Sequence, residues 1–371
     1  MIPKKHLVWQ FIRTGERSFS EDTSLLDRVV DLYALGRKWK CRPAGDGLAS
    51  KTYIVTSGQG KWVLKQYRKQ IQPQAISFIH SLLLQLEEQK FPASRLNLTP
   101  NGQDYVTMDG NCYAMFYYAP GYRSDGFVMT KSLRYRHIKQ AGAALGRFHC
   151  LTADMMLHGQ RNHGYKTTVS RERWDSYDDY PDEWSELVTQ AIQLRNREPL
   201  IPDTISKHIK DKMVNLVRTE NERALLPITI THGDYGPWNL LFRPLAVLNS
   251  VIDFDDVSLE ERIEEVAASI LPFAAVRSND RLNIEDGRVF LESYHQEYPL
   301  TLDELQALPR VLERYLLKRA LTILRRYIVY GRKGDEKKML DVVSWLDWMD
   351  PSGLMILQKL TSTILDSAHR D

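Results

Sequence analysis

Short apolar runs separated by turn residues occupy the first third of the chain and predict a small β-sheet. Residues 52–55 and 61–65 have strand-type composition and are joined by a turn at 57–60, which predicts a β-hairpin. Two further runs, 105–108 and 112–118, predict additional strands, and the second run ends at a Pro-Gly pair. Helical spacing of apolar residues predicts helices at 22–40 and 74–89 around these strands.

Beyond residue 118 the pattern is mostly helical. Apolar residues at helical spacing over 138–148 predict a helix, in which Gly142 and Gly146 would permit close contact with another helix. From residue 285 to the end the spacing is again helical, including 311–330 and 340–348. The chain, with 371 residues, is long enough for two lobes with a substantial core.

The most informative stretch interrupts this helical region with short strands and tight loops. Gly233, Gly236 and Pro237 disfavour regular structure between apolar runs at 228–230 and 240–242, so Asp234 and Asn239 are expected on a loop between strands. A third polar residue, Asp253, ends the next apolar strand. A loop held by strands on both sides can fix such groups at the mouth of a cleft.

These three side chains suit phosphoryl transfer. One carboxylate can accept the proton of an attacking hydroxyl, and hard oxygen ligands can hold Mg²⁺ against nucleotide phosphates. The alternative is that the His-Gly-Asp turn and the pair of aspartates are ordinary loop residues without a catalytic role. However, the motif with Asp234 and Asn239 and the motif with Asp253 occur in the order that this chemistry requires, and each lies beside a predicted strand.

The sequence HGDYGPWN over 232–239, followed by IDFDD with Asp253 fourteen positions after Asn239, resembles the H-G-D-x-x-x-x-N and I-D-F/W pattern of the aminoglycoside phosphotransferase and choline kinase family. The surrounding sequence looks closest to homoserine-kinase-type and spore-coat-associated kinase-like branches. The resemblance covers about residues 22–330. It implies an α+β, two-lobed protein-kinase-like fold, with a β-sheet N-lobe over 1–117 and a mostly helical C-lobe over 118–371.

The resemblance also implies the site residues, the cofactors ATP and Mg²⁺, and a small-molecule hydroxyl acceptor. Asp234 would be the catalytic base, and Asn239 and Asp253 would hold Mg²⁺. The expected nucleotide contacts are the glycine loop (residues 45–50), a phosphate-binding lysine and backbone groups at the hinge, namely Gly45, Gly47, Ser50, Lys65, Tyr117, Tyr118 and Ala119. For His149, His232 and Glu265 it implies structural roles.

One departure from the family pattern concerns Lys65. Related kinases use a glutamate on the helix after this lysine to orient it, but no acidic residue occurs between Gln66 and Leu86. Gln74, Ser77 or His80 would have to replace it, or no residue does. Adenine recognition has an alternative too, because the aromatic run that ends at the hinge also fits a core strand.

Two acidic regions are candidates for binding the acceptor: Asp178 and Asp179, in a segment rich in acidic and aromatic residues, and Asp255 with Asp256 beside the metal motif. Such groups suit a cationic amine or a polyhydroxylated sugar. The alternative is a solvated helical face with its aromatic rings turned to the core. The acceptor therefore stays open among amino alcohols, sugars, amino sugars and homoserine-like amino acids.

Composition narrows the possible partners and cellular locations of the protein. A net charge of +3 without a dense Lys/Arg run gives no reason to expect nucleic acid as a partner. Three widely spaced cysteines form no CxxC pair, and the longest apolar stretch, 267–276, is too short to span a bilayer. We expect a soluble, cytoplasmic enzyme without membrane partners, and nothing indicates its oligomeric state.

Two other function classes remain open at this stage. A non-catalytic relative could bind nucleotide as a structural or regulatory signal, although such a protein has no need of Asp234 as a base. A protein kinase is the other, but Asp253-Phe254-Asp255 stands where that class has Asp-Phe-Gly, and residues 154–227 show no activation-loop pattern.

Overall fold

The computed structural model describes residues 23–36, 38–44, 50–69, 71–126, 129–155, 157, 179–194, 201–220, 226–276, 281–330 and 335–368. A small lobe is built on an antiparallel sheet of β1 (Trp39–Pro43), β2 (Lys51–Ser57), β3 (Gly60–Gln66), β6 (Asn111–Tyr117) and β4 (Leu96–Asn97), in that order, with β5 (Val106–Met108) also paired to β6. The predicted hairpin is confirmed as β2 and β3, in which Thr52 lies opposite Lys65.

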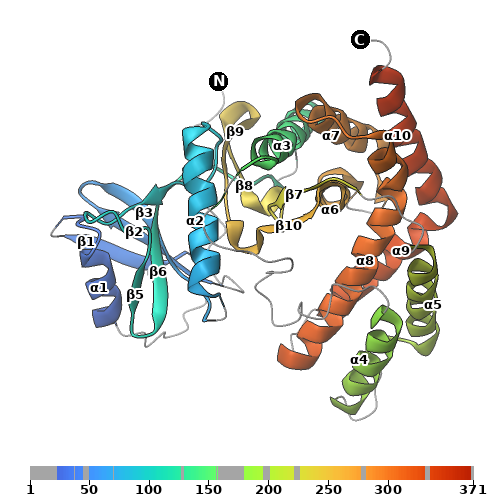
Figure 1. Cartoon of the computed structure of the whole chain (residues 1–371), viewed down its shortest axis with the longest axis horizontal. Helices are drawn as coiled ribbons and strands as arrows, with labels where there is room; N and C mark the ends of the chain where they lie inside the picture. Colours follow the sequence, from blue (N-terminus) through green and yellow to red (C-terminus); the bar gives the residue numbers. More distant parts are fainter. Residues whose placement is uncertain are drawn as a thin grey trace.

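Two helices cover the sheet of the small lobe (Figure 1). The helix α1 (Thr23–Asp31) buries Val29 and Val30 against Val55 and Leu64. The helix α2 (Pro73–Glu88) buries an apolar face that joins the core of the other lobe; this face contains Ile76, Ile79, Leu83 and Leu86.

The predicted helix at 22–40 is wrong over its second half. The helix ends at Asp31, and residues 39–43 instead form strand β1 paired with β2. Ala34 and Gly36 have φ values of 51° and 90°, in the left-handed region, so the chain turns there and cannot continue as a helix. Apolar spacing alone did not separate the short helix from the strand that follows it.

The large lobe is mostly helical, and its described elements fall into two groups. Around the centre lie α3 (Lys131–Thr152), α6 (Arg262–Ala274), α7 (Ile284–Glu297) and α8 (Leu302–Tyr330). Farther out lie α4 (Tyr180–Leu194), α5 (Asp203–Glu220), α9 (Asp335–Trp348), the π-helix η6 (Met349–Gly353) and α10 (Leu354–Ala368) (Figure 1). Short 3₁₀ turns occur at η1 (Ser124–Gly126) and η4 (Pro244–Ala246), and β11 (Ala275–Val276) pairs with β12 (Arg281–Leu282).

Two antiparallel ribbons bring the loop residues of the large lobe together. The strand β7 (Ile228–Thr231) pairs with β10 (Ser258–Glu261), and β8 (Leu240–Arg243) pairs with β9 (Val247–Val251). The Asp234 loop follows β7, and Asp253 follows β9 after one intervening residue. Hydrogen bonds of Val251 with Pro92 and Ser94 join the second ribbon to the small lobe.

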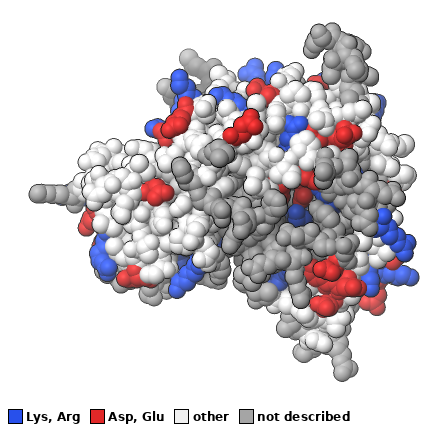
Figure 2. Space-filling view, in the orientation of Figure 1, with Lys and Arg blue, Asp and Glu red and all other residues white. Residues whose placement is uncertain are grey.

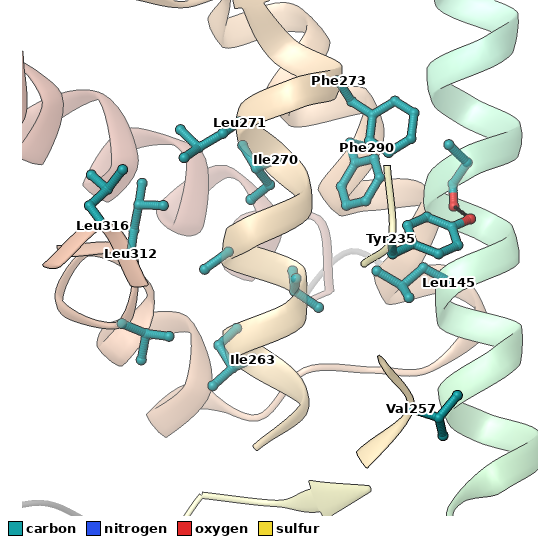
Figure 3. Close-up of a cluster of buried hydrophobic side chains, with 14 of the residues drawn as sticks. Leu145, Tyr235, Val257, Ile263, Ile270, Leu271, Phe273, Phe290, Leu312 and Leu316 are labelled. Carbon is teal, nitrogen blue, oxygen red and sulfur yellow. Dashed lines mark hydrogen bonds between the residues drawn. The ribbon is translucent and has the colours of Figure 1, made fainter. Parts of the chain in front are cut away.

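The core of the large lobe forms around α6, which lies between α3 and α8 (Figure 3). Apolar residues on opposite sides of α6, such as Leu271 and Phe273, are buried. Among the described residues, no helix has both the length and the apolar composition needed to cross a membrane. On the face shown in Figure 2, acidic and basic side chains are interspersed.

The predicted close helix contact is confirmed at Gly142 and Gly146. A Cβ atom at Gly142 would lie 2.3 Å from the carbonyl oxygen of Phe290, and one at Gly146 would lie 2.5 Å from that of Tyr294. Glycine at these positions therefore lets the backbones of α3 and α7 touch.

Replacing Gly142 by alanine is expected to lower the melting temperature, because the neighbouring atom belongs to backbone and α7 would have to move. Overpacking of this kind costs about 1–3 kcal/mol, occasionally more, which should exceed the gain in helix propensity of roughly 1 kcal/mol. Thermal denaturation of Gly142→Ala, with Gln140→Ala on the exposed face of α3 as control, measures the difference. A melting temperature no lower than that of the control would contradict the packing argument.

Candidate active site

The loop between β7 and β8 is shaped by a glycine that no other residue can replace. Gly233 has a φ of 80°, and a Cβ atom on it would lie 2.1 Å from the carbonyl oxygen of Asp256. The loop therefore packs directly on the backbone of η5 (Phe254–Asp256), the turn that follows Asp253. Tyr235 fixes the loop from the other side, because its hydroxyl donates to the carbonyl of Ala141 on α3 at 2.8 Å (Figure 3).

Glu265 on α6 holds the start of this loop. Its carboxylate accepts the backbone N–H groups of His232 at 2.8 Å and Gly233 at 2.6 Å, and it lies 2.9 Å from Nε2 of His149. Burial alone would raise the pKa of Glu265, but the hydrogen bonds from His149 and the His232 amide outweigh it and lower the pKa. The carboxylate is therefore an ionised anchor, and the structural roles predicted for Glu265 and His149 are confirmed.

His232 joins the loop to the segment that carries Asp253. Its Nδ1 accepts the backbone N–H of Asp234 at 3.3 Å, which leaves Nε2 to donate to the carbonyl of Ile252 at 3.0 Å. A backbone bond from Ile252 to Asn239 adds a second link of 2.9 Å. The predicted loop-holding role of His232 is confirmed.

Asp234 is oriented by two donors from its own loop. Its Oδ2 accepts Nδ2 of Asn239 at 2.9 Å and Nε1 of Trp238 at 3.2 Å. Burial raises the pKa of Asp234 to about 6; His232 opposes this shift and the charge of Asp256 adds to it. A carboxyl group held in one orientation and titrating near neutral pH can take up a proton from a hydroxyl group.

Asn239 and Asp253 belong to two segments that a backbone hydrogen bond from Ile252 to Asn239 joins. The amide nitrogen of Asn239 is used by the carbonyl and carboxylate of Asp234, so the side-chain oxygen is the atom left for a cation. Asp253 has a φ of 67° and its side chain is 51% exposed. The strand before Asp253 is buried at Val251, but the left-handed turn carries the carboxylate out of the core and onto Lys65.

Lys65 reaches this junction from strand β3 of the small lobe. Its Nζ lies 2.8 Å from Oδ1 of Asp253 and 2.7 Å from Oδ1 of Asp255, and the other oxygen of Asp255 accepts the hydroxyl of Ser50 at 2.9 Å. Burial by itself lowers the pKa of Lys65, but the charges of Asp255 and Asp253 outweigh it and raise the pKa. The lysine charge in turn lowers the pKa of Asp253.

The predicted base, amide, carboxylate and lysine are thus joined by the Asp234–Asn239 and Lys65–Asp253 contacts and by backbone bonds between their loops. A sequence profile of the phosphotransferase enzyme family matches residues 40–318 of this chain. The chain belongs to this family. The resemblance stated from the two sequence motifs is confirmed.

This phosphotransferase has relatives of similar sequence and solved structures of similar fold. Homoserine kinases from Caulobacter sp. (strain K31) and Paramagnetospirillum magneticum are 20% and 22% identical; the alignments cover 75% and 81% of this chain and 78% and 86% of theirs. An amicoumacin kinase solved with AMP-PNP and Ca²⁺ has a TM-score of 0.65 at 15% identity, covering 92% of this chain and 94% of that one. A microcompartment-associated aminopropanol kinase has a TM-score of 0.64 at 16% identity, with 91% and 100% covered. The predicted two-lobed kinase-like fold is confirmed.

The remaining predicted site residues of the phosphotransferase belong to the glycine loop, the hinge and the acidic segment. Gly45, Gly47 and Asp178 lie outside the described residues, while Ser50 is described and buried. At the hinge, the backbone N–H of Tyr117 donates to Arg95 and that of Tyr118 donates to Lys61. Those two amides are therefore used within the small lobe, and Ala119 follows them.

The described part of the acidic and aromatic segment begins at Asp179, which is exposed where α4 starts. Two rings of this segment face inward: Tyr180 and Trp184 are buried, and the indole of Trp184 donates to the carbonyl of Ser206 at 3.1 Å. Glu183 forms an ion pair with Arg325 on α8. In Figure 1, α4 lies beside the outer end of α8, apart from β7 and β10.

Sequence reasoning missed Arg319 on α8. Its guanidinium donates to the hydroxyl of Tyr315 at 3.2 Å. Tyr315 is the largest influence raising the pKa of Arg319, and the charge of Asp234 contributes, which puts this arginine within electrostatic range of the predicted base. The helical spacing of 311–330 indicated only a core helix, so nothing in the sequence distinguished this exposed arginine from other surface cations.

Proposed function

We propose that this phosphotransferase transfers the γ-phosphate of ATP to a hydroxyl group of a small molecule, with Asp234 as the catalytic base. The observation that carries the proposal is the arrangement of Asp234. Its carboxylate is oriented by Asn239 and Trp238, and its pKa is raised to about 6 in a half-buried position. A protein that only bound nucleotide would have no use for such a group.

In this proposal the nucleotide lies between the lobes, with its phosphates at Lys65 and beneath the glycine loop. Lys65, whose side chain is 12% exposed, lies beside the carboxylates and brings the positive charge that phosphate oxygens require. Adenine would be recognised by backbone groups at 117–119. Because the amides of Tyr117 and Tyr118 are used elsewhere, we assign the donor to the N–H of Ala119.

The oxygen donors at the junction fit Mg²⁺. Asp253 supplies an accessible carboxylate and Asn239 a side-chain oxygen, and Mg²⁺ is commonly held by one or two such groups together with phosphates and water. A bound ion would neutralise charge on the phosphates. The contribution of the chain is to place Asp253 and Asn239, through the backbone bond between Ile252 and Asn239.

The acceptor is proposed to be an amino alcohol, a sugar, an amino sugar or a homoserine-like amino acid. The kinases with similar sequences are named for homoserine, and one structural neighbour is named for aminopropanol. Asp256 and Arg319 place charges of both signs within electrostatic range of Asp234. Acceptors that carry both an amine and a carboxylate therefore belong among the candidates alongside simple amines.

A direct test measures ADP formation with and without Mg²⁺ over a panel of hydroxylated amines, sugars and amino acids. We expect at least one acceptor to raise ADP formation above the hydrolytic background, and ³¹P NMR to show a new phosphate monoester. The Asp234→Asn protein, purified in the same way, controls for contaminating kinases. ATP binding without any Mg²⁺-dependent ADP formation would favour the alternative, a nucleotide-binding relative with a structural or regulatory role.

A further inference from the structure

The helix α2 does not supply a carboxylate to the phosphate-binding lysine. Its acidic residues, Glu87 and Glu88, both lie in the last turn, and Glu87 pairs with Arg95 at 2.7 Å. In the described part of the chain, α2 is linked to the lysine through an aromatic ring. Lys65 Nζ lies 5.7 Å from the ring centroid of Tyr67, whose hydroxyl lies 2.8 Å from Nε2 of His80 on α2.

The carboxylates that do contact Lys65 come from the large lobe, and they differ in environment. The side chain of Asp253 is 51% exposed and has the freedom needed by a cation ligand. The side chain of Asp255 is 7% exposed, with one oxygen on Lys65 and the other on the Ser50 hydroxyl. Asp255 therefore has the properties of a permanent anchor, because both of its oxygens are satisfied by the small lobe.

We propose that Asp255 is the positioning residue for Lys65, in place of a helix carboxylate, and that it links the end of the glycine loop to this lysine. The inference rests on the proposed function, since it concerns how the same site binds ATP. It also assigns Asp255 a different role from the acceptor contact suggested by its sequence position. Because both oxygens of Asp255 already contact the small lobe and its side chain is only 7% exposed, little of this carboxylate is open to an acceptor.

This arrangement has a mechanical consequence. In kinases that use a helix glutamate, a shift of the helix can disconnect the lysine. Here the anchor lies in η5, directly beside the loop of Asp234, since Gly233 packs on the carbonyl of Asp256. Lys65 therefore keeps a fixed position relative to the loop of Asp234, and the position of α2 should matter little for ATP binding.

The test compares Asp255→Asn with Glu87→Gln, the same loss of charge on α2. ATP affinity is measured without acceptor by calorimetry, and KM is measured separately for ATP and for the acceptor. Loss of a buried, charge-assisted hydrogen bond should weaken ATP binding roughly 10- to 100-fold in Asp255→Asn. The acceptor KM should stay within about twofold, and Glu87→Gln should match the wild-type protein. Unchanged ATP affinity, or a raised acceptor KM with normal ATP binding, would overturn the inference.

A double-mutant cycle with Lys65→Met separates positioning from a general structural effect. If Asp255 acts through Lys65, Asp255→Asn should weaken ATP binding no further once Lys65 is replaced. The same comparison serves if Asp255→Asn alone does not fold, because the double variant removes both charges of the ion pair together. A further loss of affinity in the double variant, relative to Lys65→Met, would contradict the inference.

The experiment also distinguishes failure of this inference from failure of the proposed function. If the wild-type protein binds no ATP, the proposed function fails and the inference fails with it. If the wild-type protein binds ATP and phosphorylates an acceptor while Asp255→Asn behaves like Glu87→Gln, only the inference fails.

Discussion

Replacing Asp234 by alanine is expected to lower turnover by ~10²–10⁴-fold or more while ATP affinity changes little. The carboxylate is the proposed acceptor of the substrate proton, and its contacts are with Asn239 and Trp238 rather than with Lys65. Steady-state kinetics with a saturating acceptor, combined with calorimetric measurement of ATP binding, would separate the two effects.

The isosteric variant Asp234→Asn tests whether lost proton transfer or altered packing causes the fall in turnover of Asp234→Ala. A carboxamide can keep the contacts of the loop, yet it cannot take up the proton, so we expect this variant to be about as inactive as Asp234→Ala. Turnover equal to that of the wild-type protein in either variant would remove Asp234 from the mechanism.

The raised pKa of Asp234 gives the same prediction a pH dependence. Because only the ionised carboxylate is a base, kcat/KM should fall as the pH drops through about 6. Asp256→Asn should move this fall in kcat/KM to lower pH by removing a neighbouring negative charge.

The raised pKa also affects stability, because the folded protein holds the proton of Asp234 more tightly than the unfolded chain does. Ionisation of Asp234 as the pH rises from about 4 towards 6 therefore costs stability, and Asp234→Asn should melt at a higher temperature at pH 7.

Replacing Asp253 by asparagine is expected to abolish Mg²⁺-dependent turnover and leave the fold intact. The change removes the charge of the one accessible carboxylate that we assign to the cation, while Asp255 continues to hold Lys65. Because the side chain is half exposed, its neutralisation should disturb packing little. Activity is measured over a range of Mg²⁺ concentrations, and circular dichroism and thermal denaturation check the fold.

The control for Asp253→Asn is Asp303→Asn, which makes the same change at an exposed carboxylate in the first turn of α8. It should show wild-type Mg²⁺ dependence. Normal turnover of Asp253→Asn at ordinary Mg²⁺ concentrations would rule out the metal role, and recovery only at much higher Mg²⁺ would support a weakened site.

The sequence by itself determined the local features of this protein. The turn formers around Asp234 predicted the loop between β7 and β8, because glycine and proline act on their own neighbours. The β2–β3 hairpin could be predicted equally well, since its turn and both strands lie within sixteen residues of sequence. The two motifs also sufficed to place the chain in its family, as the profile match confirms.

Tertiary structure decided which of these local elements contact one another. Lys65 and Asp255 are separated by 190 positions, and no pattern in the chain shows that the second acidic residue of IDFDD faces the lysine while α2 does not. Likewise, the exposure of Asp253 depends on the left-handed turn at its own position, and the approach of Arg319 to Asp234 depends on the packing of α8. Periodicity and turn chemistry report only on near neighbours in the chain, whereas burial and ion pairing depend on which distant segments fold against each other.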